Sequence, residues 1–222
     1  WSRLRRCELS QVHIEDLPWI LPLLSADTTV FPLNEMPRFT FGVKSPIGAL
    51  EVGRCTPAFV TDLVNSLTTP SLKKLSITPD RPLSSHFETS DEDLTSIIIL
   101  FLRHSACTLT SLNLDVAIPG RDLVSILGLL EVSSLLHLTI GGQAELVDAL
   151  TTHGLLPHLQ SLDMNSWFCR LTEATVVAML ESRRPMLRTL RIRQDKMNSL
   201  LSQATVNELI EKGLEVLEYG FS

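Results

Sequence analysis

The stretch MLRTLRI at residues 186–192 decides the fold, because Leu187, Leu190 and Ile192 in it form the pattern LxxLxL. Five other segments have a similar pattern of apolar residues, namely SLKKLSI (71–77), TLTSLNL (108–114), SLLHLTI (134–140), HLQSLDM (158–164) and GLEVLEY (213–219). A single match means little, since two leucines and a third apolar residue recur by chance in a chain rich in leucine. Six successive matches are the signature of a repeat architecture.

The spacing of the copies supports this interpretation. Their first leucines stand at positions 72, 109, 135, 159, 187 and 214, which gives one interval of 37 residues followed by intervals of 26, 24, 28 and 27. Leucine-rich repeats are about 20–29 residues long. The long first interval contains the stretch Thr78–Thr89, which is rich in Pro and Ser and is interpreted as a surface insertion.

Segments with helical character lie between the copies, and each follows residues that favour the start of a helix. The predicted helices are 58–67 after Thr56-Pro57, 91–105 after Ser90, 121–130 after Gly120, 173–182 after Thr172 and 203–213 after Ser202. The second and third apolar residues of LxxLxL point to the same side of a short strand, and the first anchors the incoming turn. The expected fold is therefore α/β: a leucine-rich-repeat solenoid with a curved parallel sheet and helices on its outer face.

The first part of the chain is less regular. LRRCEL (4–9), MPRFTF (36–41) and IGALEV (47–52) fit the apolar pattern, but the last two begin only eleven residues apart. Either they form a hairpin around Gly42 to Pro46, or one match is accidental, and one degenerate repeat is the preferred interpretation. We expect a single domain with irregular repeats over 1–71 and regular repeats over 72–222. Because repeat-like sequence begins within four residues of Trp1, we expect a longer parent protein.

Composition limits the classes of partner. The net charge of −6, with 25 acidic and 19 basic residues, argues against a general nucleic-acid binder, which needs a basic face. The longest apolar run, Ile97–Leu102, is too short to span a bilayer, and no secretory signal pattern opens the chain. The four cysteines are far apart and form no CxxC pair. We therefore expect an intracellular protein, cytoplasmic or nuclear, without a membrane partner.

The alternation of LxxLxL segments with helices resembles the ribonuclease-inhibitor-like class of leucine-rich repeats. The Asn or Cys that better-known repeats place three residues after the third apolar position is missing, and these positions hold Val12, Asp80, Ala117, Gln143, Trp167 and Asp195. Phrases such as LPWILPLLS (17–25) and LLPHLQSLDM (155–164) resemble the repeat tails of fungal F-box proteins. That resemblance implies a substrate receptor of a cullin-RING ubiquitin ligase, whose adaptor would bind an F-box segment upstream of this chain.

Common catalytic and cofactor signatures are missing from the sequence: it has no GxSxG, Walker-type loop, HExxH, EF-hand or dinucleotide fingerprint. We therefore predict neither an enzyme nor a bound cofactor. His153 and His158 are a weak metal signal, because no Cys or carboxylate accompanies them. His104 near Cys107 raises the idea of an activated thiol, but a cysteine after an apolar helix is favoured as a small buried side chain.

Two charged runs have alternative readings. The acidic run at residues 91–93 fits the first turn of a helix better than a metal or acidic binding site. Arg183, Arg184, Arg188, Arg191 and Arg193 form the one basic concentration, which either grips an acidic peptide or phosphate or is merely solvated.

A partner surface follows from the strand pattern. If the strands line a concave face, the side chains between and just after the leucines point outward and form a polar surface of mixed charge. The candidates for contact with a protein or peptide are Lys74, Asn113, Asp115, His137, Asp163, Asn165, Arg191, Arg193 and Glu218. Trp167 follows a strand at the rim and is either an interface anchor or a filler between repeats. Trp19 is expected in the core.

Two other functions stay open. One is a leucine-rich scaffold unrelated to ubiquitin, such as a regulator of a small GTPase, which would also bind proteins. The other, more distant, is a hydrolase or transferase on a compact α/β fold, which would require polar residues gathered in a deep pocket.

Overall fold

A computed structural model describes residues 6–8, 17–25, 29–31, 42–55, 67–79, 91–115, 118–141, 144–152, 154–165, 172–194 and 200–220. Within these ranges, nine strands form one sheet in the order β1 (Arg6–Glu8), β2 (Thr29–Phe31), β4 (Ala49–Cys55), β6 (Lys74–Pro79), β7 (Ser111–Leu114), β8 (His137–Gly141), β9 (Ser161–Asn165), β10 (Thr189–Gln194) and β11 (Glu215–Gly220). Every neighbouring pair is parallel. The order in the sheet is the order along the chain.

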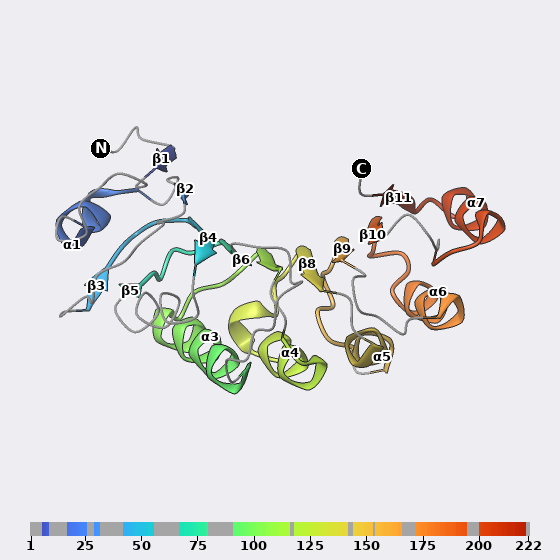
Figure 1. The fold of residues 1–222 in the computed structure, drawn as a ribbon, viewed down its shortest axis with the longest axis horizontal. Helices are drawn as coiled ribbons and strands as arrows, with labels where there is room; N and C mark the ends of the chain where they lie inside the picture. Colours follow the sequence, from blue (N-terminus) through green and yellow to red (C-terminus); the bar gives the residue numbers. More distant parts are fainter. Residues whose placement is uncertain are drawn as a thin grey trace.

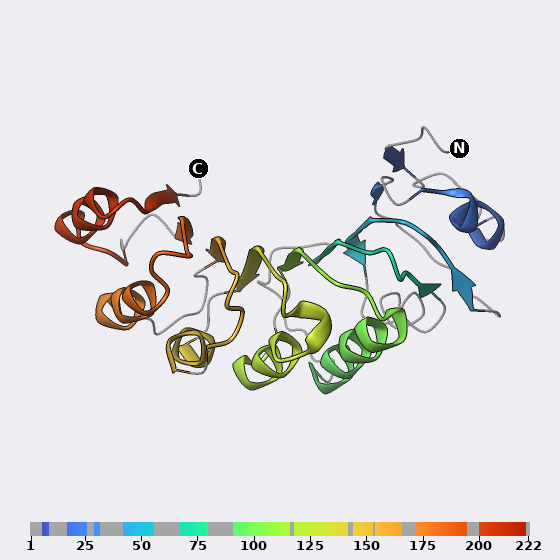
Figure 2. The same ribbon diagram turned by 180° about the vertical axis from the view of Figure 1, so that it is seen from behind.

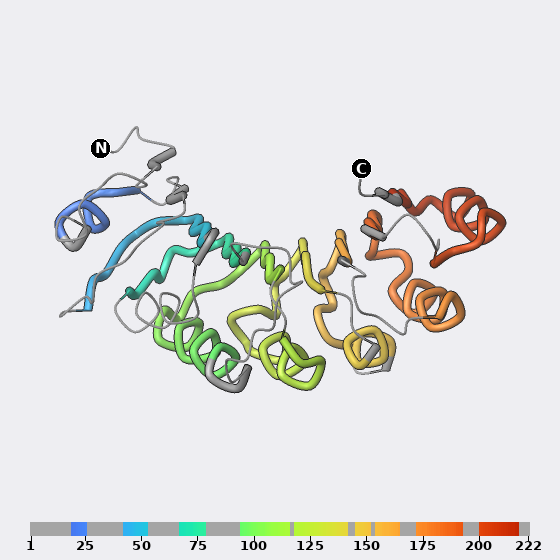
Figure 3. The backbone as a smooth tube through the Cα atoms, viewed as in Figure 1, coloured from blue at the N-terminus to red at the C-terminus, as the bar shows by residue number. Residues whose placement is uncertain are grey.

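The helices of the described ranges alternate with these strands. They are α1 (Leu17–Ile20), the 3₁₀ turn η2 (Leu21–Leu23), α3 (Asp91–Ser105), α4 (Gly120–Leu127), the 3₁₀ turn η3 (Leu130–Val132), α5 (Ala144–Thr152), α6 (Glu173–Ser182) and α7 (Gln203–Glu211). In Figure 1 the strands from β4 to β11 lie side by side along one side of the molecule, and α3 to α7 lie along the other. Figure 2 shows the same two layers from behind, and Figure 3 traces them in chain order.

The LxxLxL positions form the core, as the sequence predicts. Register aligns the second position of each copy from β6 to β10 in one row, whose residues are at most 3% exposed: Leu75, Leu112, Leu138, Leu162 and Leu190. The third position forms a second row that is at most 2% exposed: Ile77, Leu114, Ile140, Met164 and Ile192. Aliphatic side chains from successive strands therefore stack into one continuous core, to which burial contributes about 25 cal/mol per Å² of apolar surface.

Backbone hydrogen bonds join each repeat to the next where the strands begin. The carbonyl of Lys73 accepts from the N–H groups of Thr110 and Ser111 at 2.8 and 3.0 Å. The equivalent carbonyls of Gly48, Thr110, Leu136 and Gln160 each accept two N–H groups from the following repeat in the same way. These bonds run from β4 to β10 and need no particular side chain, so the repeats are linked although the Asn of better-known repeats is missing.

Several helix predictions are confirmed, and side-chain caps account for two of them, α6 and α7. α3 has the predicted bounds, and so does α6, where Thr172 Oγ1 accepts from Thr175 N–H at 3.2 Å. α7 begins as predicted after Ser202, whose Oγ accepts from Thr205 N–H at 3.3 Å, and it ends at Glu211. Such a cap satisfies one of the free N–H groups in the first turn. Of the helix predicted over 121–130, residues 121–127 are confirmed in α4, which already includes Gly120, and 130–132 form a separate 3₁₀ turn.

The first third departs from the prediction. Val43–Lys44 form the strand β3, which pairs in parallel with β5 (Leu67–Thr68), while β4 pairs in parallel with β2 and β6. The hairpin around Gly42 to Pro46 is therefore wrong, and Leu67 ends no helix. The segments 36–41 and 58–66 lie outside the described residues. Thr78 and Pro79 belong to β6, so they are not part of an insertion, and 80–89 are also outside the described residues.

Trp19 is not a core residue, because it is 77% exposed. From the same segment, Leu21 and Leu24 are the buried residues, each 2% exposed, and Leu23 is 52% exposed. Leu21 and Leu24 are three residues apart, which places them on one side of the 3₁₀ turn and leaves Trp19 and Leu23 outside. Among the described residues, no helix combines the length and the apolar character needed to cross a membrane.

Candidate functional site

None of the described helices covers one face of the sheet from β4 to β11 in Figure 1, and we call this the open face. Because side chains alternate between the two sides of a strand, the register defines which positions belong to it. Its middle row crosses seven strands at Glu51, Ser76, Asn113, Thr139, Asp163, Arg191 and Leu217. A first row precedes it at Lys74, Ser111, His137, Ser161, Thr189 and Glu215, and a last row follows at Gly141, Asn165, Arg193 and Tyr219.

The open face therefore brings together most of the predicted contact residues. Lys74, His137 and Arg191 are exposed, and Asp115, directly after β7, is partly exposed. Asn165 and Arg193 have the expected register positions. Trp167 lies outside the described residues. This surface is mostly polar and carries both acidic and basic residues, a composition that suits a partner bound through hydrogen bonds and matched charges.

The middle strands carry a polar contact between repeats. Asn113 on β7 donates from Nδ2 to Ser76 Oγ on β6 at 3.0 Å. Asn113 Oδ1 is buried and has no hydrogen-bond partner within the described part of the chain. Because this oxygen is buried, a bound donor could reach it only after rearrangement of the surrounding side chains.

Asp163 differs from the prediction of an outward, accessible carboxylate, because it is only 7% exposed. Its register neighbours in the middle row are Thr139 and Arg191, which stand on either side of it. Neighbouring side chains on adjacent strands are close enough to cover a short aspartate. Asp163 is engaged within the molecule, so its direct contact with a partner would require rearrangement.

Glu218 departs from the prediction in another way. Register aligns Glu218 with Ile192, in the row of buried third positions, and aligns Leu217 with Arg191 on the open face. The turn before β11 contains Gly213 with φ of 86°, and Leu214 N–H donates to Leu209 O at 3.0 Å. This tight turn starts β11 one residue out of phase with its LxxLxL match, and a one-residue shift exchanges the two faces of a strand.

The predicted basic cluster is divided by the structure. Arg183 is 9% exposed and donates to the carbonyl oxygens of Leu150 and Leu156, and this burial lowers the pKa of its guanidinium. Arg184 donates to Lys212 O at 2.9 Å and to Glu181 at 3.5 Å. Within the described residues, the exposed side chains of Arg188 and Arg191 make no hydrogen bond or ion pair.

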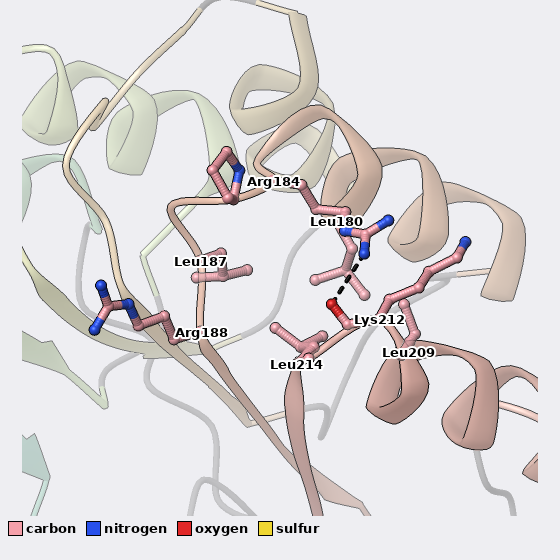
Figure 4. Close-up of a pocket in the computed structure, with 9 residues that line it drawn as sticks. Leu180, Arg184, Leu187, Arg188, Leu209, Lys212 and Leu214 are labelled. Atoms are coloured by element: carbon pink, nitrogen blue, oxygen red, sulfur yellow. Dashed lines mark hydrogen bonds between the residues drawn. The ribbon is translucent and has the colours of Figure 1, made fainter.

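A pocket of about 330 Å³ lies between the turns that follow α6 and α7. Leu180, Leu187, Leu209 and Leu214 line it, and the Arg184 guanidinium reaches over them to the Lys212 carbonyl (Figure 4). Arg184 is bound to the Lys212 carbonyl, and Arg188 also lines the pocket. The pocket is thus an apolar gap between two repeats that Arg184 bridges.

Side chains weighed for metal or thiol chemistry are not gathered in one place. Cys107 is buried and free, and burial raises the pKa of its thiol to about 11. His104 and His158 are exposed, and His153 lies outside the described residues. Among the described residues, no three His, Cys, Asp or Glu side chains are close enough to share a metal ion. The prediction of a buried, structural Cys107 is confirmed.

No protein-family model matches the chain, and no curated protein sequence is significantly similar to it. The structure itself shows an α/β arrangement of alternating strands and helices around a long parallel sheet.

Proposed function

We propose that this chain is a leucine-rich-repeat solenoid of the ribonuclease-inhibitor-like kind and that its open face is a concave surface that binds another protein. The observation that carries the proposal is the register of β4 to β11, which arranges polar and charged side chains in continuous rows on a face without helices. Long parallel sheets are ordinarily covered on both faces. A wide polar face left open is the kind of surface that repeat proteins use for binding.

We further propose that the bound protein is a target presented to a ubiquitin ligase. Support comes from the likeness of the irregular leucine repeats, including LPWILPLLS and LLPHLQSLDM, to the repeat tails of fungal F-box proteins. In this proposal the chain recognises the target, and the ligase adaptor binds a separate segment of the parent protein. The chain is assigned no catalytic activity.

The proposal of protein binding is tested with two arginine substitutions in the full-length protein. Thr139→Arg places a long cation in the middle of the open face, where Thr139 is partly buried. Ser125→Arg places the same side chain at an exposed position on α4 and is the matched control. Proteins cross-linked to the wild type and to the Ser125→Arg variant, but lost from the Thr139→Arg variant, support binding at the open face. Equal recovery with all three proteins overturns it.

The ubiquitin role has its own test. The full-length protein should co-purify with a cullin-RING adaptor, and the Thr139→Arg variant should keep the adaptor while losing the target. The target should then accumulate in cells that carry this variant. If Thr139→Arg loses the target but no adaptor co-purifies with the full-length protein, the ubiquitin role is contradicted. The function would then be that of a leucine-rich scaffold.

A further inference from the structure

We propose that the end of the open face formed by β10 and β11 anchors the partner and that it recognises a peptide segment with a carboxylate next to an apolar or aromatic side chain. This inference rests on the proposed protein-binding function and adds the chemistry of the partner. We call this end the anchor region, and it consists of Arg191 and Leu217, which register pairs on neighbouring strands.

The out-of-phase start of β11 creates the anchor region. Register pairs Arg191 with Leu217 and Arg193 with Tyr219. Val216 packs against the core together with Leu214, whereas Leu217 is partly exposed and does not pack there. Leu217 therefore faces the opposite side from Val216, as alternation along a strand requires.

Along the middle row from β4 to β11, the apolar residue is Leu217 on β11. From β6 to β9 that row contains small or polar residues, namely Ser76, Asn113, Thr139 and Asp163. At β10 and β11 the row continues with Arg191 and Leu217, and the register of the last row adds Arg193 and Tyr219. Arg is enriched among the residues that contribute most to protein binding. The anchor region is thus the part of the open face best suited to hold a partner.

The cation of the anchor region is available for a ligand. Arg191 is exposed, and its guanidinium makes no hydrogen bond or ion pair within the described part of the chain. Its neighbour Asp163 is buried and already engaged, while Arg183 and Arg184 are bound to carbonyl groups of the protein itself. A guanidinium binds a carboxylate through two parallel N–H bonds, so a free arginine favours an acidic side chain.

Charge elsewhere on the open face favours a peptide over a phosphate polymer. Glu51, Asp115 and Glu215 lie along the same face or directly after it, and the net charge of the chain is −6. A nucleic acid would be repelled by these carboxylates, since its binding depends on cations spread over the whole contact. A peptide needs only one carboxylate at Arg191, with an apolar side chain on Leu217.

The inference is tested by selection from a displayed library of random peptides, with the full chain as the target. Enriched peptides should contain Asp or Glu within a few residues of Leu, Phe, Tyr or Trp. Arg191→Glu should weaken the binding of these peptides about tenfold and should enrich Lys or Arg in a second selection. Arg188→Glu is the matched control, because Arg188 is also exposed and unpaired within the described residues but lies outside the open face.

A second pair of variants tests the apolar contact. Leu217→Asn should weaken the same peptides about tenfold, and Leu130→Asn should leave them unchanged because Leu130 is 82% exposed on η3. Circular dichroism in urea verifies that each variant is folded.

The outcomes separate the two proposals. Selected peptides that resist Arg191→Glu and Leu217→Asn but are lost with Thr139→Arg overturn the anchor region and retain the open face as the binding surface. Selected peptides that also resist Thr139→Arg overturn both. A selection that enriches no acidic and apolar sequence overturns the inference as well.

Discussion

Arg183 donates two hydrogen bonds to the carbonyl oxygen of Leu150, from Nε at 2.8 Å and from Nη2 at 2.6 Å. Leu150 lies in the last turn of α5, where carbonyl groups have no partner within the helix. Nη1 of the same guanidinium donates to Leu156 O at 3.1 Å. The buried Arg183 guanidinium at the end of α6 therefore provides hydrogen-bond donors for the C-terminal end of α5 and holds the two repeats together.

Replacing Arg183 should destabilise the protein although it touches no proposed ligand. Arg183→Met retains much of the volume but leaves the Leu150 and Leu156 carbonyls buried without a donor, and we expect a loss of about 3 kcal/mol in the free energy of unfolding. Arg183→Lys keeps the charge but cannot reach both carbonyls, so its loss should be smaller. Urea unfolding followed by circular dichroism measures both. An Arg183→Met variant as stable as Arg188→Met, at an exposed position, would refute this role.

Glu173 links α6 to α7 and provides a pH-dependent contact. Its Oε1 accepts from the Ser202 N–H at 2.9 Å, from the Ser202 hydroxyl at 2.8 Å and from the Thr205 hydroxyl. The hydrogen bond from Thr205, followed by those from Ser202, lowers the pKa of Glu173 below its ordinary value of 4.5. The contact therefore stabilises the fold fully above that ordinary value and is lost as the pH falls through the lowered pKa of the folded protein.

The stability of Glu173→Gln measured against pH should show this dependence. The variant loses the charge that the three donors favour, so its urea midpoint should lie slightly below that of the wild type at pH 7, and the difference should vanish in strong acid. Glu145→Gln removes an exposed acidic residue from the first turn of α5 and is the control for the helix-dipole effect, so its midpoint at pH 7 should fall less than that of Glu173→Gln. A difference that persisted unchanged into strong acid would show that the carboxylate charge is not responsible.

Cys107 should resist alkylation in the folded protein. It is 3% exposed, and burial raises the pKa of its thiol to about 11, so the reactive thiolate is scarce at pH 8 and shielded as well. Iodoacetamide at pH 8, followed by peptide mapping, should leave Cys107 unmodified in the native protein and label it in urea. If native Cys107 is labelled as fast as a free thiol, the hypothesis that His104 activates this thiol would have to be reconsidered.

The elements that could be predicted are those whose local sequence contains its own signal. Each strand from β6 to β10 contains two buried apolar residues separated by one residue. Thr172 and Ser202 are side-chain caps that mark the starts of α6 and α7. β2 was missed because TVF lacks the pattern, and α5 was missed because no recognised capping residue directly precedes Ala144.

The candidate site was less predictable, because it depends on contacts between repeats. Arg183 and Arg191 look alike in the sequence, yet one is bound to backbone carbonyls and the other is exposed. Every residue has a backbone carbonyl, so residue types do not show which carbonyl will accept a hydrogen bond from an arginine of another repeat. Asp163 has the predicted register position but is only 7% exposed, and this burial cannot be recognised from one strand alone.

The sequence pattern and the structure disagree on which residues of β11 face the core, and this disagreement can be tested. The LxxLxL match at 213–219 places Leu217 in the core, whereas the register places Val216 against the core and Leu217 on the open face. An aspartate is costly where the wild-type side chain packs against apolar neighbours and nearly neutral where it meets water. Val216→Asp should therefore lower the free energy of unfolding by about 2 kcal/mol, and Leu217→Asp by less than about 1 kcal/mol. Urea unfolding of the two variants decides the phase, because a larger loss for Leu217→Asp would restore the phase of the sequence pattern and remove the anchor region.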